Sequence, residues 1–367
     1  MSYGVYGSGR LLEKCCAYLK DCGFTDACCI TDRVEDVELS RSFPGFESCN
    51  LSEAASFDAV ILVPENAWIS VAVRRLKAAG VTSMCYLPAY YAEEGREIGD
   101  ESFIWPDLSL PRLEYLEYHV SWHCNLKCRG CTHFSNIIEG ERFGDIDAFV
   151  RDMQRLQELF WGIFKIRLMG GEPLLNPKLP EFVAVSREAF PDADIRVVSN
   201  ALLLREDMED LLDTMGACGV GFDVSMYPPT KAAIGRVDGI CRKKGVKLFV
   251  TPEVREFRAG MDPEGRQEPG EVYAACPARH CAFLGDGVIS TCAMPQLIDI
   301  YNGCFGQNIP VVAEDIIDLY EPGLTGEELL RRLHSPMDIC RFCTQKQRSF
   351  PWEPAPRTTA EAGDWWA

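Results

Sequence analysis

The first ninety residues alternate short apolar runs with stretches that have helical spacing. Apolar runs at residues 3–6, 27–30, 59–63 and 83–87 have the length of buried strands, and residues 11–19 and 70–79 repeat apolar positions at helical intervals. Strands separated by helices indicate a small parallel sheet. We therefore predict a Rossmann-like α/β domain over residues 1–92, followed by a polar, proline-containing linker over residues 93–112.

A second and longer α/β series begins at residue 113. The pattern predicts strands at 115–120, 166–169, 195–199, 219–224 and 247–251, with helices at 146–160, 179–189, 205–215 and 230–244. Such a series implies right-handed parallel crossovers, hence an open barrel or a doubly wound sheet, with ligand sites at the carboxyl ends of the strands. We predict a core barrel over 113–265, a cysteine-rich domain over 266–346 and a terminal tail over 347–367.

Three glycines lie where the first strand turns into the first helix, as in a dinucleotide-binding turn. Gly4, Gly7 and Gly9 precede Asp32 at the end of the second strand, but Leu12 stands where the full motif needs a third glycine. A scaffold or partner-docking domain therefore fits this segment better than a working nucleotide site.

Charge and hydropathy exclude two classes of partner. The chain has 37 Lys and Arg against 55 Asp and Glu, a formal charge of −18, which repels a nucleic-acid backbone. No window approaches eighteen consecutive apolar residues, and the N-terminus lacks a basic region followed by an apolar run. We expect a cytoplasmic protein that binds neither nucleic acid nor membranes.

Eighteen cysteines in a long chain without a signal peptide favour thiol or metal chemistry over disulfides. Half of them, including Cys15, Cys16 and Cys29, follow no ligand spacing, and we expect these to be small buried hydrophobes. The other half fall in two groups, over residues 124–131 and 276–343.

The first group has a C-x3-C-x2-C spacing directly after a predicted strand, at Cys124, Cys128 and Cys131. Three thiolates in one short loop can hold three irons of a cubane and leave the fourth iron open for reaction. The alternative is a zinc site with His123 or His133 as the fourth ligand.

This loop, together with Gly170-Gly171-Glu172-Pro173 at the end of the second barrel strand, resembles the radical S-adenosylmethionine superfamily over about residues 113–260. The resemblance implies a partial (β/α)6 barrel, a site-differentiated [4Fe–4S] cluster, S-adenosylmethionine as a second cofactor, and an electron donor such as flavodoxin or ferredoxin. We expect the glycines to let the backbone approach the methionine ammonium and Glu172 to supply a counter-charge.

The same resemblance suggests further cofactor contacts. Asn200 and Ser225 follow the third and fourth barrel strands and are candidates to contact the cofactor. The family usually has an aromatic residue before the third cysteine, where adenine packs, whereas this chain has Gly130. We expect the adenine to be covered elsewhere, at Phe134.

The second group offers five thiols for one four-ligand site. A hairpin turning at Gly285-Asp286 places two of them on one face, and a C-x2-C pair adds two more. The tail resembles the SPASM and twitch domains of radical enzymes, which implies one auxiliary [4Fe–4S] cluster, with Cys276 or Cys281 opening the motif. A zinc ribbon is the alternative. The five candidates are Cys276, Cys281, Cys292, Cys340 and Cys343.

The whole arrangement resembles radical enzymes found among polysaccharide-modifying and glycosyl-transfer proteins. This implies a sugar, nucleotide-sugar or cyclitol substrate that is oxidised, or epimerised, at a carbinol carbon. Cys304, outside any paired motif, is a candidate hydrogen-atom donor for epimerisation. The alternatives are a ribosomal-peptide maturase and a non-catalytic iron–sulfur electron-transfer protein, and the intact GGEP turn argues against the latter.

Overall fold

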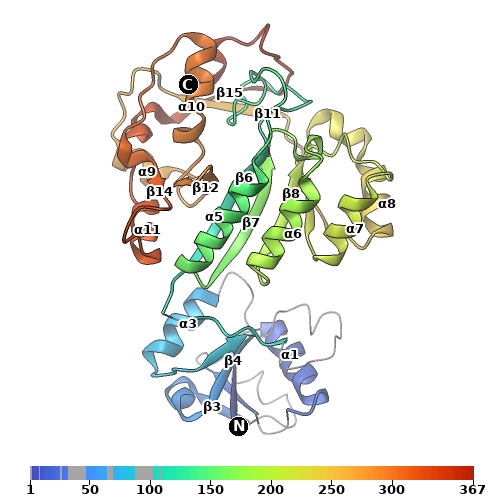
Figure 1. Cartoon of the computed structure of the whole chain (residues 1–367), viewed down its shortest axis with the longest axis vertical. Coiled ribbons are helices and arrows are strands. Elements are labelled where there is room, and N and C mark those ends of the chain that lie inside the picture. The colour runs from blue at the N-terminus through green and yellow to red at the C-terminus, as the bar shows by residue number, and fades with distance from the viewer. Residues whose placement is uncertain are drawn as a thin grey trace. The chain divides into compact units, whose positions relative to one another are not determined.

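The computed structural model describes residues 2–7, 9–24, 27–31, 47–63, 69–86, 102–107 and 109–367. The chain divides into two compact units, Met1–Ser109 and Leu110–Ala367, each of which has its own sheet (Figure 1). Within the described part of the chain, no helix is long and apolar enough to cross a bilayer.

The N-terminal unit is a parallel five-stranded sheet in the order β3-β2-β1-β4-β5. Its strands are β1 (Tyr3–Gly7), β2 (Ala27–Thr31), β3 (Glu47–Asn50), β4 (Ala59–Val63) and β5 (Met84–Tyr86), and its helices are α1 (Gly9–Asp21) and α3 (Ile69–Ala78). A short 3-10 helix, Leu51–Ser56, follows β3. The strand β3 is not predicted by the hydrophobic pattern, because the run Glu-Ser-Cys-Asn is neither apolar nor alternating.

The core of this unit explains several of its cysteines and one glycine. Cys15, Cys16 and Cys29 are fully buried among apolar side chains, as predicted for small hydrophobes. A Cβ atom on Gly7 would lie 2.4 Å from the carbonyl oxygen of Val63, so the close approach of β1 to β4 requires glycine there. Asp32 lies outside the described residues.

The second unit is built on an eight-stranded sheet in the order β10-β9-β8-β7-β6-β12-β13-β14. Five parallel strands run outward in chain order, which confirms the predicted α/β class: β6 (Arg112–Ser121), β7 (Gly162–Gly170), β8 (Asp194–Ser199), β9 (Gly221–Val224) and β10 (Leu248–Val250). On the other edge of β6 lie β12 (Ala282–Gly285), β13 (Val288–Ser290) and β14 (Ile317–Asp318). The next strand in the chain after β10, β11 (Glu256–Met261), leaves this sheet and pairs with β15 (Cys343–Pro351) near the C-terminus.

Four helices cover one face of the parallel strands: α5 (Ile146–Leu159), α6 (Leu179–Ala189), α7 (Glu209–Ala217) and α8 (Ile234–Lys243) (Figure 1). Leu116, Tyr118 and Val120 of β6 belong to the apolar core on this side. Successive residues of a strand point to opposite faces, so Glu117 and His119 lie on the other face, which we call the concave face. The helices thus cover only the face opposite to Glu117 and His119.

The remaining elements follow β11. They are the helices α9 (Pro269–Ala275), α10 (Met294–Phe305) and α11 (Gly326–Leu333), with 3-10 turns at Ala313–Asp315, Asp338–Phe342 and Ala362–Trp365. Residues of α10 and of the turns at Asp338–Phe342 and Ala362–Trp365 form a second apolar cluster around Phe283, Tyr301 and Trp365. The buried residues of α11, Leu329 and Leu333, belong instead to the core of the main sheet.

The predicted hairpin register is wrong by one residue on each strand. Phe283 pairs with Ser290 and Gly285 with Val288, so the turn is Asp286-Gly287 rather than Gly285-Asp286. Both turn residues have positive φ, 49° and 82°, as a type I′ turn requires, and Asp-Gly meets this requirement readily. Neither Cys281 nor Cys292 belongs to the paired strands, so strand pairing does not fix the position of one cysteine relative to the other.

Candidate active site

The cysteine loop follows β6 directly and encloses a small cavity at the carboxyl end of the sheet. Cys124, Cys128 and Cys131 all line this cavity, whose volume is about 140 Å³. The ends of the neighbouring strands β7, β8 and β9 complete it, because parallel strands end at the same edge. The predicted residues that meet there from these three ends are Gly170, Gly171, Asn200 and Ser225.

The two glycines of the GGEP turn allow close contact with the cysteine loop. A Cβ atom on Gly170 would lie 2.1 Å from the carbonyl oxygen of Ser121, and one on Gly171 would lie 2.1 Å from that of His123. The N–H of Gly171 donates to Ser121 at 2.7 Å and that of Glu172 donates to His123 at 3.0 Å. Glycine is therefore required here by packing against the loop, a reason that the sequence analysis did not foresee.

Glu172 is fully buried and does not line the cavity. Its carboxylate accepts hydrogen bonds from Ser199 Oγ at 2.6 Å, from the backbone N–H of Asn200 at 3.0 Å and from that of Leu174 at 3.1 Å. Burial raises the pKa of Glu172 to about 7, against the lowering effect of these donors. The carboxylate thus fastens the end of β8, and its role as a counter-charge to the methionine ammonium stays a prediction. Pro173 opens a buried 3-10 turn behind it.

Asn200 is the residue that Glu172 holds in place. Its side-chain amide donates to Asn125 Oδ1 at 2.8 Å, and its carbonyl oxygen accepts from Thr230 Oγ1 at 2.9 Å. Asn200 therefore joins the cysteine loop to the third strand end from within the cavity wall.

The predicted adenine cover, Phe134, lies away from the cavity. Its ring is 1% exposed, packs against Tyr301 and Trp365, and lies outside the cavity lining. The aromatic wall of the cavity comes instead from Tyr227 and Phe257, whose rings stack at 5.9 Å between centroids. Tyr227 lies two residues beyond Ser225, so the strand-end position was a signal that sequence reasoning could have used.

The donor set of the cavity fits an iron–sulfur cluster. Burial raises the pKa of Cys124 and of Cys128 to about 12 and raises that of Cys131, so these thiolates need a positive partner at neutral pH. Three irons of a cubane supply that charge, one to each cysteine. Among the described residues no group of three or more His, Cys, Asp or Glu is placed around a single metal ion.

A second group of thiols gathers beyond the sheet. Burial raises the pKa of Cys292 well above its ordinary value, and the neighbouring thiols of Cys343, Cys340 and Cys276 raise it further. Burial likewise raises the pKa of Cys343 to about 12, with added effects of Cys340 and Cys276. These mutual effects place the four thiols in one neighbourhood, and four thiols are the donor set of a protein-held cluster.

Two other cysteines are placed differently. Burial raises the pKa of Cys281 to about 11, and the charges of Glu117, Cys276 and Arg167 have smaller effects on it. Because Glu117 and Arg167 lie on the concave face of the sheet, Cys281 lies toward that face. Cys304, the predicted hydrogen-atom donor, lies on α10 against the second apolar cluster and outside the cavity lining.

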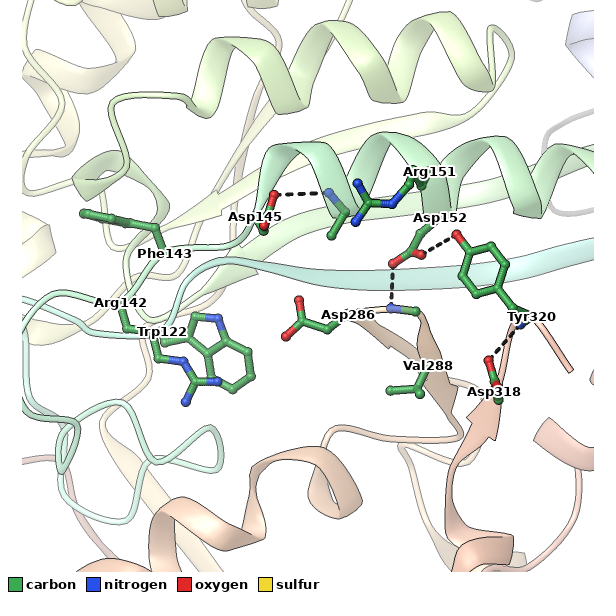
Figure 2. Close-up of a pocket in the computed structure, with 12 residues that line it drawn as sticks. Trp122, Arg142, Phe143, Asp145, Arg151, Asp152, Asp286, Val288, Asp318 and Tyr320 are labelled. Carbon is green, nitrogen blue, oxygen red and sulfur yellow. Dashed lines mark hydrogen bonds between the residues drawn. The ribbon is translucent and has the colours of Figure 1, made fainter.

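A larger cavity, of about 590 Å³, lies elsewhere and contains no cysteine (Figure 2). Asp152 of α5 accepts hydrogen bonds there from the N–H of Gly287 and from the hydroxyl of Tyr320, both at 2.9 Å. Trp122 stacks on Arg142, whose guanidinium carbon lies 3.8 Å from the ring centroid. The bonds of Asp152 attach the β12–β13 turn to α5, which indicates a structural role for this carboxylate.

The fold and the cavity define a class of protein, and comparison with known proteins agrees. Residues 119–248, which contain the cysteine loop and the GGEP turn, match the family model of the radical SAM superfamily. This segment is thus a radical SAM domain, and members of that superfamily use a [4Fe–4S] cluster and S-adenosylmethionine. The cofactor prediction is thereby confirmed, and the cysteine-rich C-terminal region fits an auxiliary cluster.

Curated relatives match a part of the chain. GTP 3′,8-cyclase of Campylobacter curvus is 33% identical over 104 residues, which are 28% of this chain and 31% of that protein. The Nautilia profundicola enzyme of the same name is 31% identical over 140 residues, 36% of this chain and 41% of that protein. The chain thus spans less than half the length of these relatives.

Solved structures show weaker likenesses. The crystal structure of BtrN in complex with AdoMet and 2-DOIA gives a TM-score of 0.41 at 18% identity, covering 64% of this chain and 94% of that one. Streptococcus suis SuiB bound to its precursor peptide SuiA gives 0.25 at 17% identity, covering 39% of each chain.

Proposed function

We propose that this radical SAM enzyme acts on a sugar, nucleotide sugar or cyclitol, and that it oxidises a carbinol carbon to a ketone. When bound, the first cluster and S-adenosylmethionine would supply a radical that takes the carbinol hydrogen, and an auxiliary cluster would supply an electron acceptor. The residues of the concave face would bind the substrate and accept its proton.

The unpaired polar groups of the concave face carry this proposal. Both ring nitrogens of His119 are buried without a hydrogen-bond partner, and so is Nε of Arg167. Buried polar groups in folded proteins are normally paired, so such atoms suggest a polar ligand. The ring of His119 lies edge-on to that of His133, 4.8 Å away, and His133 lines the cavity with the three cysteines. A hydroxyl-rich substrate would therefore lie beside the cofactor.

His119 suits a hydroxyl in particular. Burial lowers its pKa well below the ordinary value, so its imidazole is neutral and offers one donor and one acceptor. A carbinol hydroxyl needs both. Glu117 lies on the same face and accepts a hydrogen bond from Tyr115 at 2.6 Å, which keeps this carboxylate near the proposed substrate.

The charges of the concave face favour a neutral group over a triphosphate. Arg167 pairs with Asp223 at 3.3 Å, Arg196 pairs with Asp194 at 2.8 Å and with Asp223, and Lys165 pairs with Asp194. A phosphate must compete with these carboxylates for each cation. The match to GTP 3′,8-cyclases makes GTP the second candidate substrate, although the match covers only 28–36% of this chain.

A peptide substrate is the third candidate. The resemblance argues against it, because relatives that modify peptides usually carry a small winged-helix-like domain where this chain has a parallel α/β sheet.

The test is substrate-stimulated formation of 5′-deoxyadenosine under anaerobic conditions. The reconstituted protein would be given reductant, S-adenosylmethionine and, in turn, an aminocyclitol, UDP-glucose, GTP and a serine-containing peptide. We expect stimulation by a cyclitol or sugar and a product two hydrogens lighter. His119→Phe should keep substrate-free cleavage and lose the stimulation, whereas His280→Phe, an exposed control, should keep both. Stimulation by GTP or the peptide alone would contradict the proposal.

A further inference from the structure

The C-terminal tail lies directly across the cysteine loop. After β15 the strap, which we define as residues 352–355, pairs with the loop through two backbone hydrogen bonds. The N–H of Arg129 donates to Glu353 at 2.9 Å, and that of Ala355 donates to the carbonyl oxygen of Lys127 at 2.7 Å. The strap thus runs antiparallel to the segment that contains Cys128.

One side chain of the strap contacts a cluster ligand. The indole N–H of Trp352 donates to Sγ of Cys128, and the two atoms are 3.1 Å apart. The indole ring stacks on Tyr227, with 28° between the ring planes, and the backbone N–H of Trp352 donates to the carbonyl oxygen of Arg255 at 2.8 Å. The position of this donor is therefore fixed from two sides.

The loop and the tail also fit each other at Gly130. This residue has a φ of 62°, and a Cβ atom on it would lie 2.7 Å from Phe350 Cζ and 3.0 Å from the carbonyl oxygen of Asp364. Arg129 forms ion pairs with both Glu353 and Asp364. A residue of the tail thus occupies the space that an aromatic side chain at position 130 would need.

We propose that Trp352 raises the reduction potential of the first cluster by donating a hydrogen bond to its ligand Cys128. A reduced cluster carries one more negative charge, so its sulfurs accept hydrogen bonds more strongly, and an N–H donor favours the reduced form. The electron comes from an external reductant, and no bond is made or broken. This inference depends on the radical SAM domain and not on the substrate proposed above.

The experiment is a redox titration of the anaerobically reconstituted full-length chain, followed by electron paramagnetic resonance. Only the cluster with an open iron changes its signal when S-adenosylmethionine is added, so this change identifies the first cluster. The signal of the auxiliary cluster serves as an internal reference. The variants are Trp352→Phe, which removes the N–H, and Trp366→Phe. Trp366 is the matched control, because its indole donates to Tyr301 Oη at 2.7 Å and not to sulfur.

We expect Trp352→Phe to lower the ratio of reduced to oxidised first cluster about tenfold at a fixed potential, a shift of about 59 mV downward for one electron. Trp366→Phe should leave both clusters unchanged. An unshifted potential in Trp352→Phe with full iron content, or an equal shift in Trp366→Phe, would overturn the proposal. If Trp352→Phe loses iron, the variant Trp352→His, which keeps a ring N–H, should restore both the iron content and the reduction potential. A Trp352→His variant whose potential is not restored would also overturn the proposal.

Discussion

The hydrogen bonds of Glu172 allow a test of how this residue serves the cofactor. Glu172→Gln keeps the shape of the side chain but turns an amide NH₂ toward the backbone N–H of Asn200, or toward the two donors Ser199 and Leu174. At least one buried donor then loses its acceptor, at a cost of about 1–3 kcal/mol. If about half of this cost appears in ligand binding, the Kd for S-adenosylmethionine rises about two- to tenfold.

A double-mutant cycle separates the two roles that Glu172 could have. If it acts by holding Asn200, Glu172→Gln should have little further effect in an Asn200→Ala background, and the two changes should couple by about 1 kcal/mol. A carboxylate that touched the methionine ammonium would give effects that add to within about 0.5 kcal/mol. The assay is anaerobic calorimetry at matched iron content, with the exposed Glu181→Gln on α6 as the control. Additive effects, or an unchanged affinity in Glu172→Gln, would refute the reasoning.

Three further predictions concern the same groups. Because burial raises the pKa of Glu172 from 4.5 to about 7, the folded state holds this proton more tightly than the unfolded state. As the pH rises between these two values, the wild type should lose stability relative to Glu172→Gln, by about 3 kcal/mol at most, in denaturant unfolding. Parallel dependence of the two unfolding free energies on pH would contradict this. Iron analysis should find the auxiliary cluster lost in Cys276→Ala and kept in Cys281→Ala, and the opposite pattern would reassign the ligand. In heavy water the product should be a ketone without solvent deuterium at the reacting carbon, unaffected by Cys304→Ala. A deuterated epimer that disappears in Cys304→Ala would contradict this and indicate epimerisation with Cys304 as donor.

The sequence predicted the parts of the site that depend on local spacing. The three cysteines lie within eight residues, and the GGEP turn directly follows a strong apolar strand, so strand order alone brought Gly170 and Asn200 to the same edge. The position of α6 was predicted to the residue for the same reason, since its apolar positions repeat at helical intervals.

Contacts between distant segments could not be predicted in this way. Trp352 is 224 residues from Cys128, and no local pattern marks a tail residue as the neighbour of a cluster ligand. Tyr227 lines the cavity and Phe134 does not, because nearness in sequence to the third cysteine does not decide which ring faces the cavity. The hairpin turn was misplaced because Gly285-Asp286 and Asp286-Gly287 are both plausible turn pairs, and only the latter has positive φ at both positions.

The central claim is that Cys124, Cys128 and Cys131 hold the cluster that cleaves S-adenosylmethionine. The measurement is 5′-deoxyadenosine formed per chain, with iron content, in anaerobically reconstituted protein given dithionite. Wild type should bind about eight irons and form 5′-deoxyadenosine, and the variant with all three cysteines replaced by Ala should bind about half the iron and form none. Undiminished 5′-deoxyadenosine in that variant, or tightly bound zinc without iron in the wild type, would contradict the account.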